Sequence, residues 1–243
     1  MHNSHHAVAE TALSVLHRIP DVSSAVADAL DHLGCGDSIG TSGLVPLIPG
    51  TRVCGPALTL RYRRLDGSVA DNRRDGLGEL GDRALYESAR PGDVAVFECP
   101  PPADTAVVGA ISARWARLAG VAGCIVDGAI RDSGSIIGSG LPVWSSARAA
   151  RAARHRYTTD ATGIPVRIGG MLVTPGDIVI ADDDGLCVVP PAALDEVVDL
   201  CVRADAIERA LLRTMAESDS PADLHARLAR AGADASSIDR GLL

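Results

Sequence analysis

An arginine and an aspartate, Arg131 and Asp132, follow one another directly after an apolar segment of the chain. Residues 124–126 of that segment have the β-branched composition of a short buried strand, and Gly128 lets the chain turn beyond it. An arginine can hold a carboxylate or an enolate, and an aspartate can hold a hard cation or the water bound to it. Such a pair is also common in solvated turns. Whether this pair belongs to a functional site or to a solvated turn therefore depends on the segments around it.

The segments on either side of the pair predict a βαβ unit of a parallel sheet. A Pro-Gly turn at residues 91–92 leads into an expected strand at 94–98, and a helical pattern follows at about 106–119. The apolar strand that ends before Arg131 comes next, and a short helical turn is expected at 133–139. The pair therefore falls at the end of a strand, where sites on α/β scaffolds tend to lie.

The rest of the chain predicts an α/β protein with one domain over residues 1–243. N-terminal helices are expected at about 4–33, the core at about 45–190 and a C-terminal helical region at about 191–243. Within the core, the polar residues 65–81 predict a loop, and the short apolar runs of residues 165–189 predict a β-meander.

The composition is typical of a soluble globular protein and argues against several kinds of partner. Of the 243 residues, 47% are hydrophobic and 22% are charged. An aromatic content of 2% leaves few stacking platforms for bases, and a formal net charge of -8 disfavours binding to a nucleic-acid backbone. No apolar run is long enough to span a bilayer, and the N-terminus lacks the pattern of a signal peptide. We therefore expect a cytoplasmic protein with no membrane and no direct nucleic-acid partner.

Two further groups of side chains have structural explanations. The six cysteines are scattered without a CxxC pair, which predicts buried, reduced thiols. The arginines at positions 148, 151, 154 and 156 form the nearest approach to an anion-binding patch. We expect this basic segment to be a loop whose arginines pair with acidic neighbours.

Several short segments, taken in order, resemble the RraA-like family, which includes the class II aldolases for 4-hydroxy-4-methyl-2-oxoglutarate (HMG/CHA aldolases). They lie at residues 26–30, 49–50, 55–59, 91–94, 126–132, 141–143, 173–177 and 182–190. The resemblance implies a layered β/β/α swivelling-type fold with a βαβ core and a C-terminal helix. It also implies a homotrimer, or a dimer of trimers, whose active site lies between neighbouring subunits.

The resemblance further implies roles for individual residues. Arg131 would bind the oxo or carboxylate oxygen of the substrate and stabilise a developing enolate. Asp132 would be the protein ligand of a divalent metal, magnesium or manganese, which otherwise keeps several waters. Glu208, in the C-terminal helical region, matches a glutamate that the family can contribute across the subunit interface. Backbone N–H groups near a helix start would bind a substrate carboxylate. These are the amides of Gly109, Ala110, Ile111 and Ser112.

The chain departs from the aldolase pattern at two acidic positions and in one loop. Ala110 stands where the leading acid of the motif falls, and Ser135 stands where the trailing acid falls. A methyl group cannot transfer a proton, and a neutral hydroxyl does so poorly. A loop that is glycine-rich in many relatives contains three prolines here, at residues 100–102, which lack an N–H to donate.

Three functions remain open on this pattern. The first is a metal-dependent carbon–carbon lyase, an aldolase or a decarboxylase, that acts on a 2-oxo acid through a pyruvate enolate, with Glu208, Asp104 or Glu98 as the acid or base. The second is a non-catalytic protein that binds and inhibits a ribonuclease. The third is an enzyme of a specialised pathway whose substrate fills the room left by Ala110 and Ser135. The retention of an arginine and a carboxylate side by side favours an enzyme.

Overall fold

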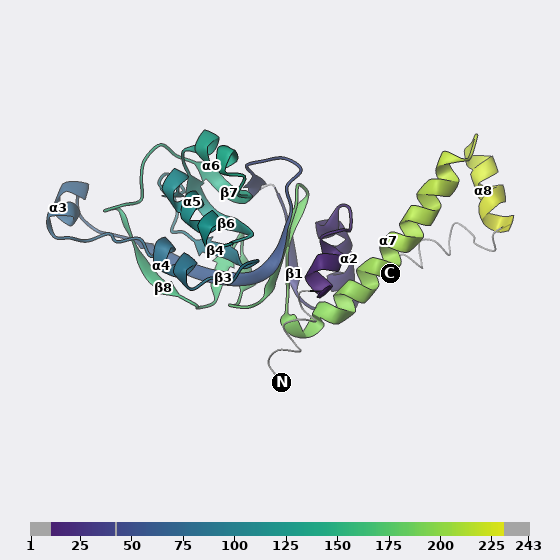
Figure 1. Ribbon diagram of the computed structural model, residues 1–243, viewed down its shortest axis with the longest axis horizontal. Coiled ribbons are helices and arrows are strands. Elements are labelled where there is room, and N and C mark those ends of the chain that lie inside the picture. The colour runs from purple at the N-terminus through teal and green to yellow at the C-terminus, as the bar shows by residue number, and fades with distance from the viewer. Residues whose placement is uncertain (1–10, 42, 231–243) are drawn as a thin grey trace. The chain divides into compact units, whose positions relative to one another are not determined.

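The computed structural model describes residues 11–41 and 43–230. The chain forms two compact units, one from Gly36–Pro191 and one from the segments on either side of it. We refer to them as the sheet unit and the helical unit (Figure 1). The single domain expected over residues 1–243 stays a prediction. No helix within the described ranges is long and apolar enough to cross a membrane.

A mixed sheet of ten strands is the centre of the sheet unit. Its main path runs in the order β1, β12, β11, β3, β4, β6, β7 and β2, while β5 pairs with β6 and β8 pairs with β3. Strands β3, β4, β6 and β7 are parallel neighbours. The strand bounds are β1 Asp37–Gly40, β2 Val45–Pro46, β3 Val53–Arg64, β4 Val94–Glu98, β5 Ala106–Val108, β6 Gly123–Ile130, β7 Val143–Arg148, β8 Tyr157–Thr162, β11 Ile178–Ala181 and β12 Gly185–Val189.

Both faces of β4 and β6 are largely buried, and these strands are apolar except at Glu98 and Asp127. On one face, Phe97 and Val126 pack against side chains of the helices α4 (Asp82–Glu87), α5 (Ala110–Leu118) and α6 (Ser133–Ser139) (Figure 1). On the other face, Val96 and Ile125 pack against a two-stranded sheet of β9 (Val166–Ile168) and β10 (Met171–Val173). These three layers confirm the expected β/β/α arrangement.

The helical unit is built around α2 (Val22–Leu33) and α7 (Leu194–Ala216), followed by α8 (Pro221–Arg230). A 3-10 turn, Pro191–Ala193, precedes α7. Helix α2 packs on α7, and the Cys201 thiol donates a hydrogen bond to the carbonyl of Ala25. Residues 11–16 are also helical, whereas residues 4–10 of the expected N-terminal helix lie outside the described residues.

The prediction of one helix over residues 106–119 is wrong at its start. Residues Ala106–Val108 form β5, which pairs in parallel with β6. Helix α5 begins only at Ala110, after the extended Gly109. The reason is tertiary, because the β-branched Val107 and Val108 are buried as a strand in the core under α5. The short strand places the N-terminus of α5 beside the end of β6.

Two other predictions are corrected by the structure. The β-meander over 165–189 is two separate hairpins, because β9 pairs only with β10 whereas β11 and β12 belong to the large sheet. The loop over 65–81 contains the short helix α3 (Val69–Arg74), whose Asp71 N–H donates to the side chain of Ser68. An N-cap serine of this kind stabilises the start of a helix. The polar composition of residues 65–81 predicted a loop instead.

Candidate active site at the end of strand β6

The backbone around Arg131 fixes the direction of the chain where β6 ends. The Arg131 N–H donates to the carbonyl of Val108 in β5 at 3.0 Å. Asp132 has a positive φ of 58°, a conformation that aspartate tolerates better than most residues. Its carbonyl accepts hydrogen bonds from the N–H groups of Ser135 and Ile136 at the start of α6. The tight turn therefore presents both side chains of the pair at the strand end.

The Asp132 carboxylate joins the end of β6 to the start of α5. Its Oδ2 accepts a hydrogen bond from the Ala110 N–H at 3.2 Å and lies 3.7 Å from Nε of Arg131. The two side chains of the pair are 42% and 43% exposed, so the ion pair itself contributes little to stability. The positive end of the helix dipole favours a carboxylate at this position. The arrangement orients both charged groups without burying either.

Gly109 is the point of closest approach between the helix start and the pair. A Cβ atom added at this residue would lie 2.9 Å from Oδ2 of Asp132 and 3.2 Å from Cγ of Arg131. Any larger side chain would therefore push at least one member of the pair away. The residue is a glycine because of this contact, since its backbone is extended rather than left-handed.

The first turn of α5 offers further amides beside the pair. The Ala113 N–H makes the first hydrogen bond inside the helix, to the carbonyl of Gly109 at 2.9 Å. The amides of Ile111 and Ser112 precede it and have no acceptor within the helix. Together with the Arg131 guanidinium, they form a cluster of donors suited to a small carboxylate.

The Ser112 side chain serves a different purpose from its backbone. Its hydroxyl lies 3.0 Å from the Tyr86 hydroxyl and hydrogen-bonds the carboxyl group of Asp82 on α4. Burial raises the pKa of Asp82, and the hydrogen bond from Ser112 partly offsets that rise. This buried contact fixes α5 to α4. Sequence reasoning missed it, because an aspartate at a helix start is ordinarily explained by the helix dipole alone.

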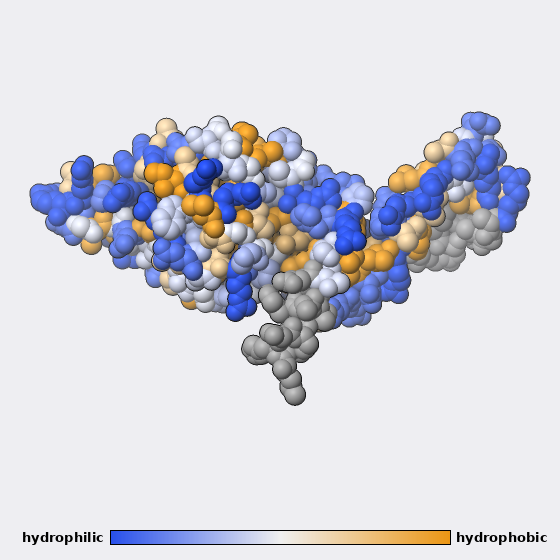
Figure 2. All heavy atoms as spheres, viewed as in Figure 1, coloured by the Kyte–Doolittle hydropathy of each residue, from blue (hydrophilic) through white to orange (hydrophobic). Residues whose placement is uncertain are grey.

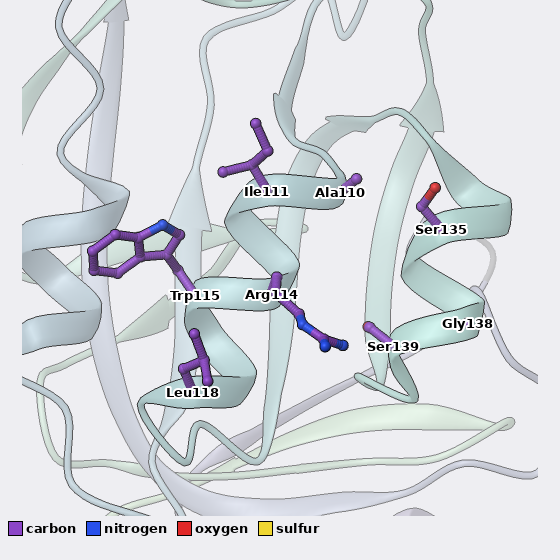
Figure 3. Close-up of a pocket in the computed structure, with 8 residues that line it drawn as sticks. All are labelled: Ala110, Ile111, Arg114, Trp115, Leu118, Ser135, Gly138 and Ser139. Atoms are coloured by element: carbon purple, nitrogen blue, oxygen red, sulfur yellow. The ribbon is translucent and has the colours of Figure 1, made fainter.

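A pocket of about 550 Å³ opens over α5 and α6, next to the pair (Figure 3). It shares Ala110 with the Asp132 hydrogen bond, and Ser135 follows Asp132 in the same turn. Figure 2 shows hydrophobic and hydrophilic side chains side by side over this part of the sheet unit. The lining residues are Ala110, Ile111, Arg114, Trp115, Leu118, Ser135, Gly138 and Ser139.

The side chains present fit a divalent metal only in a limited way. Asp132 supplies a carboxylate at the end of β6, whereas Ala110 and Ser135, where the family resemblance led us to expect acids, supply none. Within residues 11–41 and 43–230, no group of three or more histidine, cysteine, aspartate or glutamate side chains is arranged to hold a metal. Magnesium is commonly bound through one or two carboxylates, with water and substrate oxygens completing its shell. Asp132 fits a cation of that kind, held jointly with a substrate.

Glu98 and Asp104, two acids considered for proton transfer, have structural partners. Glu98 accepts a hydrogen bond from the Arg167 N–H at 2.8 Å and so anchors β9. Asp104 accepts hydrogen bonds from Thr105 and Arg64, and also pairs with Arg151 at 3.3 Å. These contacts, the Thr105 hydrogen bond first, hold the pKa of Asp104 below its usual value. Asp104 therefore does not have the properties of a proton donor near neutral pH. Its pairing with Arg151 agrees with the expectation that arginines of this loop pair with acidic neighbours.

Asp104→Asn tests the structural role of this acid. Catalysis is expected to stay within about twofold of wild type, because the side chain serves the arginines around it. A lowered pKa stabilises the folded protein above the ordinary pKa, and this stabilisation is lost as the pH falls through the folded-state value. The difference in urea midpoint between wild type and variant should therefore shrink from pH 7 towards acid pH. A large loss of turnover with an unchanged midpoint would contradict the assignment.

Glu208 lies on α7 in the helical unit and is exposed. Its proposed contribution to a neighbouring subunit's site remains a prediction. In the sheet unit, the structure brings together Arg131, Asp132 and the first-turn residues of α5.

Comparisons with known proteins identify relatives of this chain. The RraA-like family model, described as Aldolase/RraA, matches residues 23–188. A protein of Halalkalibacterium halodurans named "Putative 4-hydroxy-4-methyl-2-oxoglutarate aldolase" is 30% identical over 81% of this chain and 85% of its own length. Protein DlpA of Legionella pneumophila is 28% identical over 78% of this chain, which spans only 30% of DlpA.

One solved structure adds the three-dimensional comparison. Streptomyces coelicolor RraAS2, described as an unusual member of the RNase ES inhibitor RraA protein family, has a TM-score of 0.68 and 31% identity. The alignment covers 82% of this chain and 94% of RraAS2. The family model covers most of the sheet unit, including the end of β6 and the start of α5. The chain therefore belongs to the RraA-like family.

Proposed function

We propose that the protein is a cytoplasmic, homotrimeric carbon–carbon lyase that cleaves or decarboxylates a 2-oxo acid through a pyruvate enolate. One observation carries this proposal: Arg131, Asp132 and the N-terminus of α5 converge at the end of β6, with Ala110 N 3.2 Å from Oδ2 of Asp132. The name of the Halalkalibacterium halodurans relative supports an aldolase in particular.

In the proposed reaction, the first-turn amides of Ile111 and Ser112 bind the substrate carboxylate. The Arg131 guanidinium donates to the 2-oxo oxygen. When the carbon–carbon bond breaks, its electron pair forms the enolate, whose oxygen gains negative charge beside this guanidinium. The Ala110 N–H holds the Asp132 carboxylate in place beside the reacting oxygen. A magnesium or manganese ion, when bound at Asp132, supplies additional positive charge for that oxygen.

Proton transfer completes the reaction. In aldol cleavage, the hydroxyl of the departing fragment loses a proton and the enolate carbon gains one, which yields pyruvate. We assign the acid–base role to Glu208 of a neighbouring subunit, because Asp104 and Glu98 have structural partners. In decarboxylation, only the protonation of the enolate carbon is required.

A coupled assay of pyruvate release tests the proposed activity. Purified full-length protein is incubated with manganese or magnesium and with either oxaloacetate or 4-hydroxy-4-methyl-2-oxoglutarate, and lactate dehydrogenase reports the pyruvate formed. Turnover above the metal-only rate is expected with at least one substrate. Rates equal to the metal-only control with both would overturn the proposed lyase.

Metal binding is expected to depend on a chelating ligand, because Asp132 alone supplies too few oxygen atoms. Electron paramagnetic resonance of Mn²⁺ can measure this without turnover. Oxalate should tighten Mn²⁺ binding by about tenfold or more, and Asp132→Asn should abolish the oxalate-dependent gain. Tight Mn²⁺ binding that ignores both oxalate and this substitution would place the metal elsewhere.

A second candidate is a binding protein that inhibits a ribonuclease. The name of the Streptomyces coelicolor relative and the absence of acids at Ala110 and Ser135 favour it. Inhibition of an RNase E-type enzyme by both wild type and Arg131→Ala, combined with no lyase turnover, would support this function. Absence of inhibition with intact turnover would exclude it.

A further inference from the structure

We propose that Arg114 binds a second oxyanion at the far end of the substrate, in the pocket over α5 and α6. This inference rests on the proposed function, because the pocket adjoins the pair at the end of β6. The ligand class is a 2-oxo acid with a terminal carboxylate or phosphate-like group. Arg114 is then the residue that distinguishes this substrate from one with an apolar end.

Arg114 is the single charged side chain among the residues that line the pocket. Figure 3 shows its guanidinium extending from α5 toward Ser139 of α6, whereas Ile111, Trp115 and Leu118 point to the other side of α5. Arg114 is exposed and has no hydrogen-bond or ion-pair partner among the described residues. A guanidinium without a partner in a concave surface can bind an oxyanion through two parallel hydrogen bonds.

Other arginines near the pocket are already engaged. Arg83 lies over the ring of Trp115, at 5.7 Å from its centroid. Arg131 pairs with Asp132. Arg114 differs from both, because it has neither an aromatic ring nor a carboxylate as a partner among the described residues.

The residue one turn before Arg114 explains why its charge is not neutralised. Ala110 precedes it by four positions on α5, the spacing at which an acid would pair with an arginine on the helix surface. Ser135 supplies a neutral hydroxyl on the facing helix α6. The two positions where the aldolase motif has acids thus leave the pocket positive in a chain with a formal net charge of -8. A positive pocket beside an anion-binding helix start suits a dianionic ligand.

The distance along α5 sets the size of that ligand. Arg114 follows Ile111 and Ser112, whose amides bind the first carboxylate, by three and two residues, a rise of about 3 to 5 Å along the helix. Its long side chain carries the guanidinium further from those amides. Ser139 forms a wall rather than a second donor, because its hydroxyl already donates to the carbonyl of Ile136 at 2.6 Å. Gly138 leaves open space, since a Cβ added there would contact nothing within 4 Å. A 2-oxo acid of the length of 2-oxoadipate fits this spacing.

Calorimetric binding of matched ligands to the full-length protein tests the inference without turnover. The ligands are 2-oxoadipate, 5-phosphono-2-oxopentanoate and 2-oxohexanoate, of which the last ends in a methyl group. Wild type is expected to bind at least one of the two dianions about tenfold more tightly than 2-oxohexanoate. The preferred dianion identifies the terminal group.

Arg114→Gln should remove this preference while leaving the affinity for 2-oxohexanoate unchanged. Arg117→Gln, which removes an equal charge from the same helix outside the pocket, should keep the preference. Equal affinities in wild type, or a preference that survives Arg114→Gln, would overturn the subsite and leave the lyase proposal standing. If none of the three ligands binds wild type, the subsite is overturned, whereas the lyase is judged separately by the assay of pyruvate release. Loss of 2-oxohexanoate binding in a folded Arg114→Gln protein would also contradict a role limited to the terminal group.

Discussion

Arg131→Gln is expected to lower kcat/KM for pyruvate release by about a hundredfold to a thousandfold, as removal of a donor to a developing oxyanion does in other enzymes. Glutamine keeps much of the side-chain length but removes the positive charge. Because Arg131 is 42% exposed, its loss should change the free energy of unfolding by less than about 1 kcal/mol. Steady-state kinetics and urea unfolding of the same preparation measure both effects.

The matched control is Arg167→Gln on β9, which removes the same charge from the layer on the other face of the sheet. Its kcat/KM should remain within about twofold of wild type. Equal losses in the two variants would show that Arg131 acts only through the overall charge. A loss of stability in Arg131→Gln that matched its loss of activity would assign the residue a structural role.

Gly109→Ala is expected to lower kcat/KM by about tenfold to a hundredfold, because small displacements of positioned groups have effects of this size. The added methyl group would lie 2.9 Å from Oδ2 of Asp132, so the carboxylate must move and weaken its hydrogen bond to the Ala110 N–H. The backbone of Gly109 is accessible to alanine. The variant should therefore fold, with a free energy of unfolding within about 1 kcal/mol of wild type.

Gly134→Ala is the matched control for this substitution. Gly134 lies at the start of α6, and a Cβ added there would contact nothing within 4 Å. Alanine should keep full activity and stabilise the helix by about 0.5 to 1 kcal/mol. Full activity in Gly109→Ala would mean that the close approach does not position the pair.

Helices and strands whose patterns lie within a few neighbouring residues could be predicted from the sequence. The apolar residues of β6, the glycines around it and the helical turn at Ser133–Ser139 were placed correctly, so the pair was correctly located at a strand end. The layered α/β fold was reached through the family resemblance rather than from periodicity alone. The structure and the comparisons agree with it.

Features that depend on contacts between distant segments could not be predicted from the sequence. Val107 and Val108 fit a helical pattern, and only their pairing with β6 makes them a strand. The bond between Ser112 and Asp82 joins residues thirty positions apart on two helices, and no local pattern reports it. No local pattern in the sequence singles out Arg114 either. Its lack of a partner depends on which residues face it in the folded protein.

Exchange of the pyruvate methyl protons in deuterated water tests the central claim most directly, because it requires an enolate and no second substrate. Proton nuclear magnetic resonance follows the loss of the methyl signal in the presence of the full-length protein and magnesium or manganese. Wild type is predicted to exchange these protons well above the metal-only rate, and Arg131→Gln is predicted to fall back to that rate. A wild-type rate equal to the metal-only control, or undiminished exchange by Arg131→Gln, would contradict the assignment of an enolate-stabilising site at the end of β6.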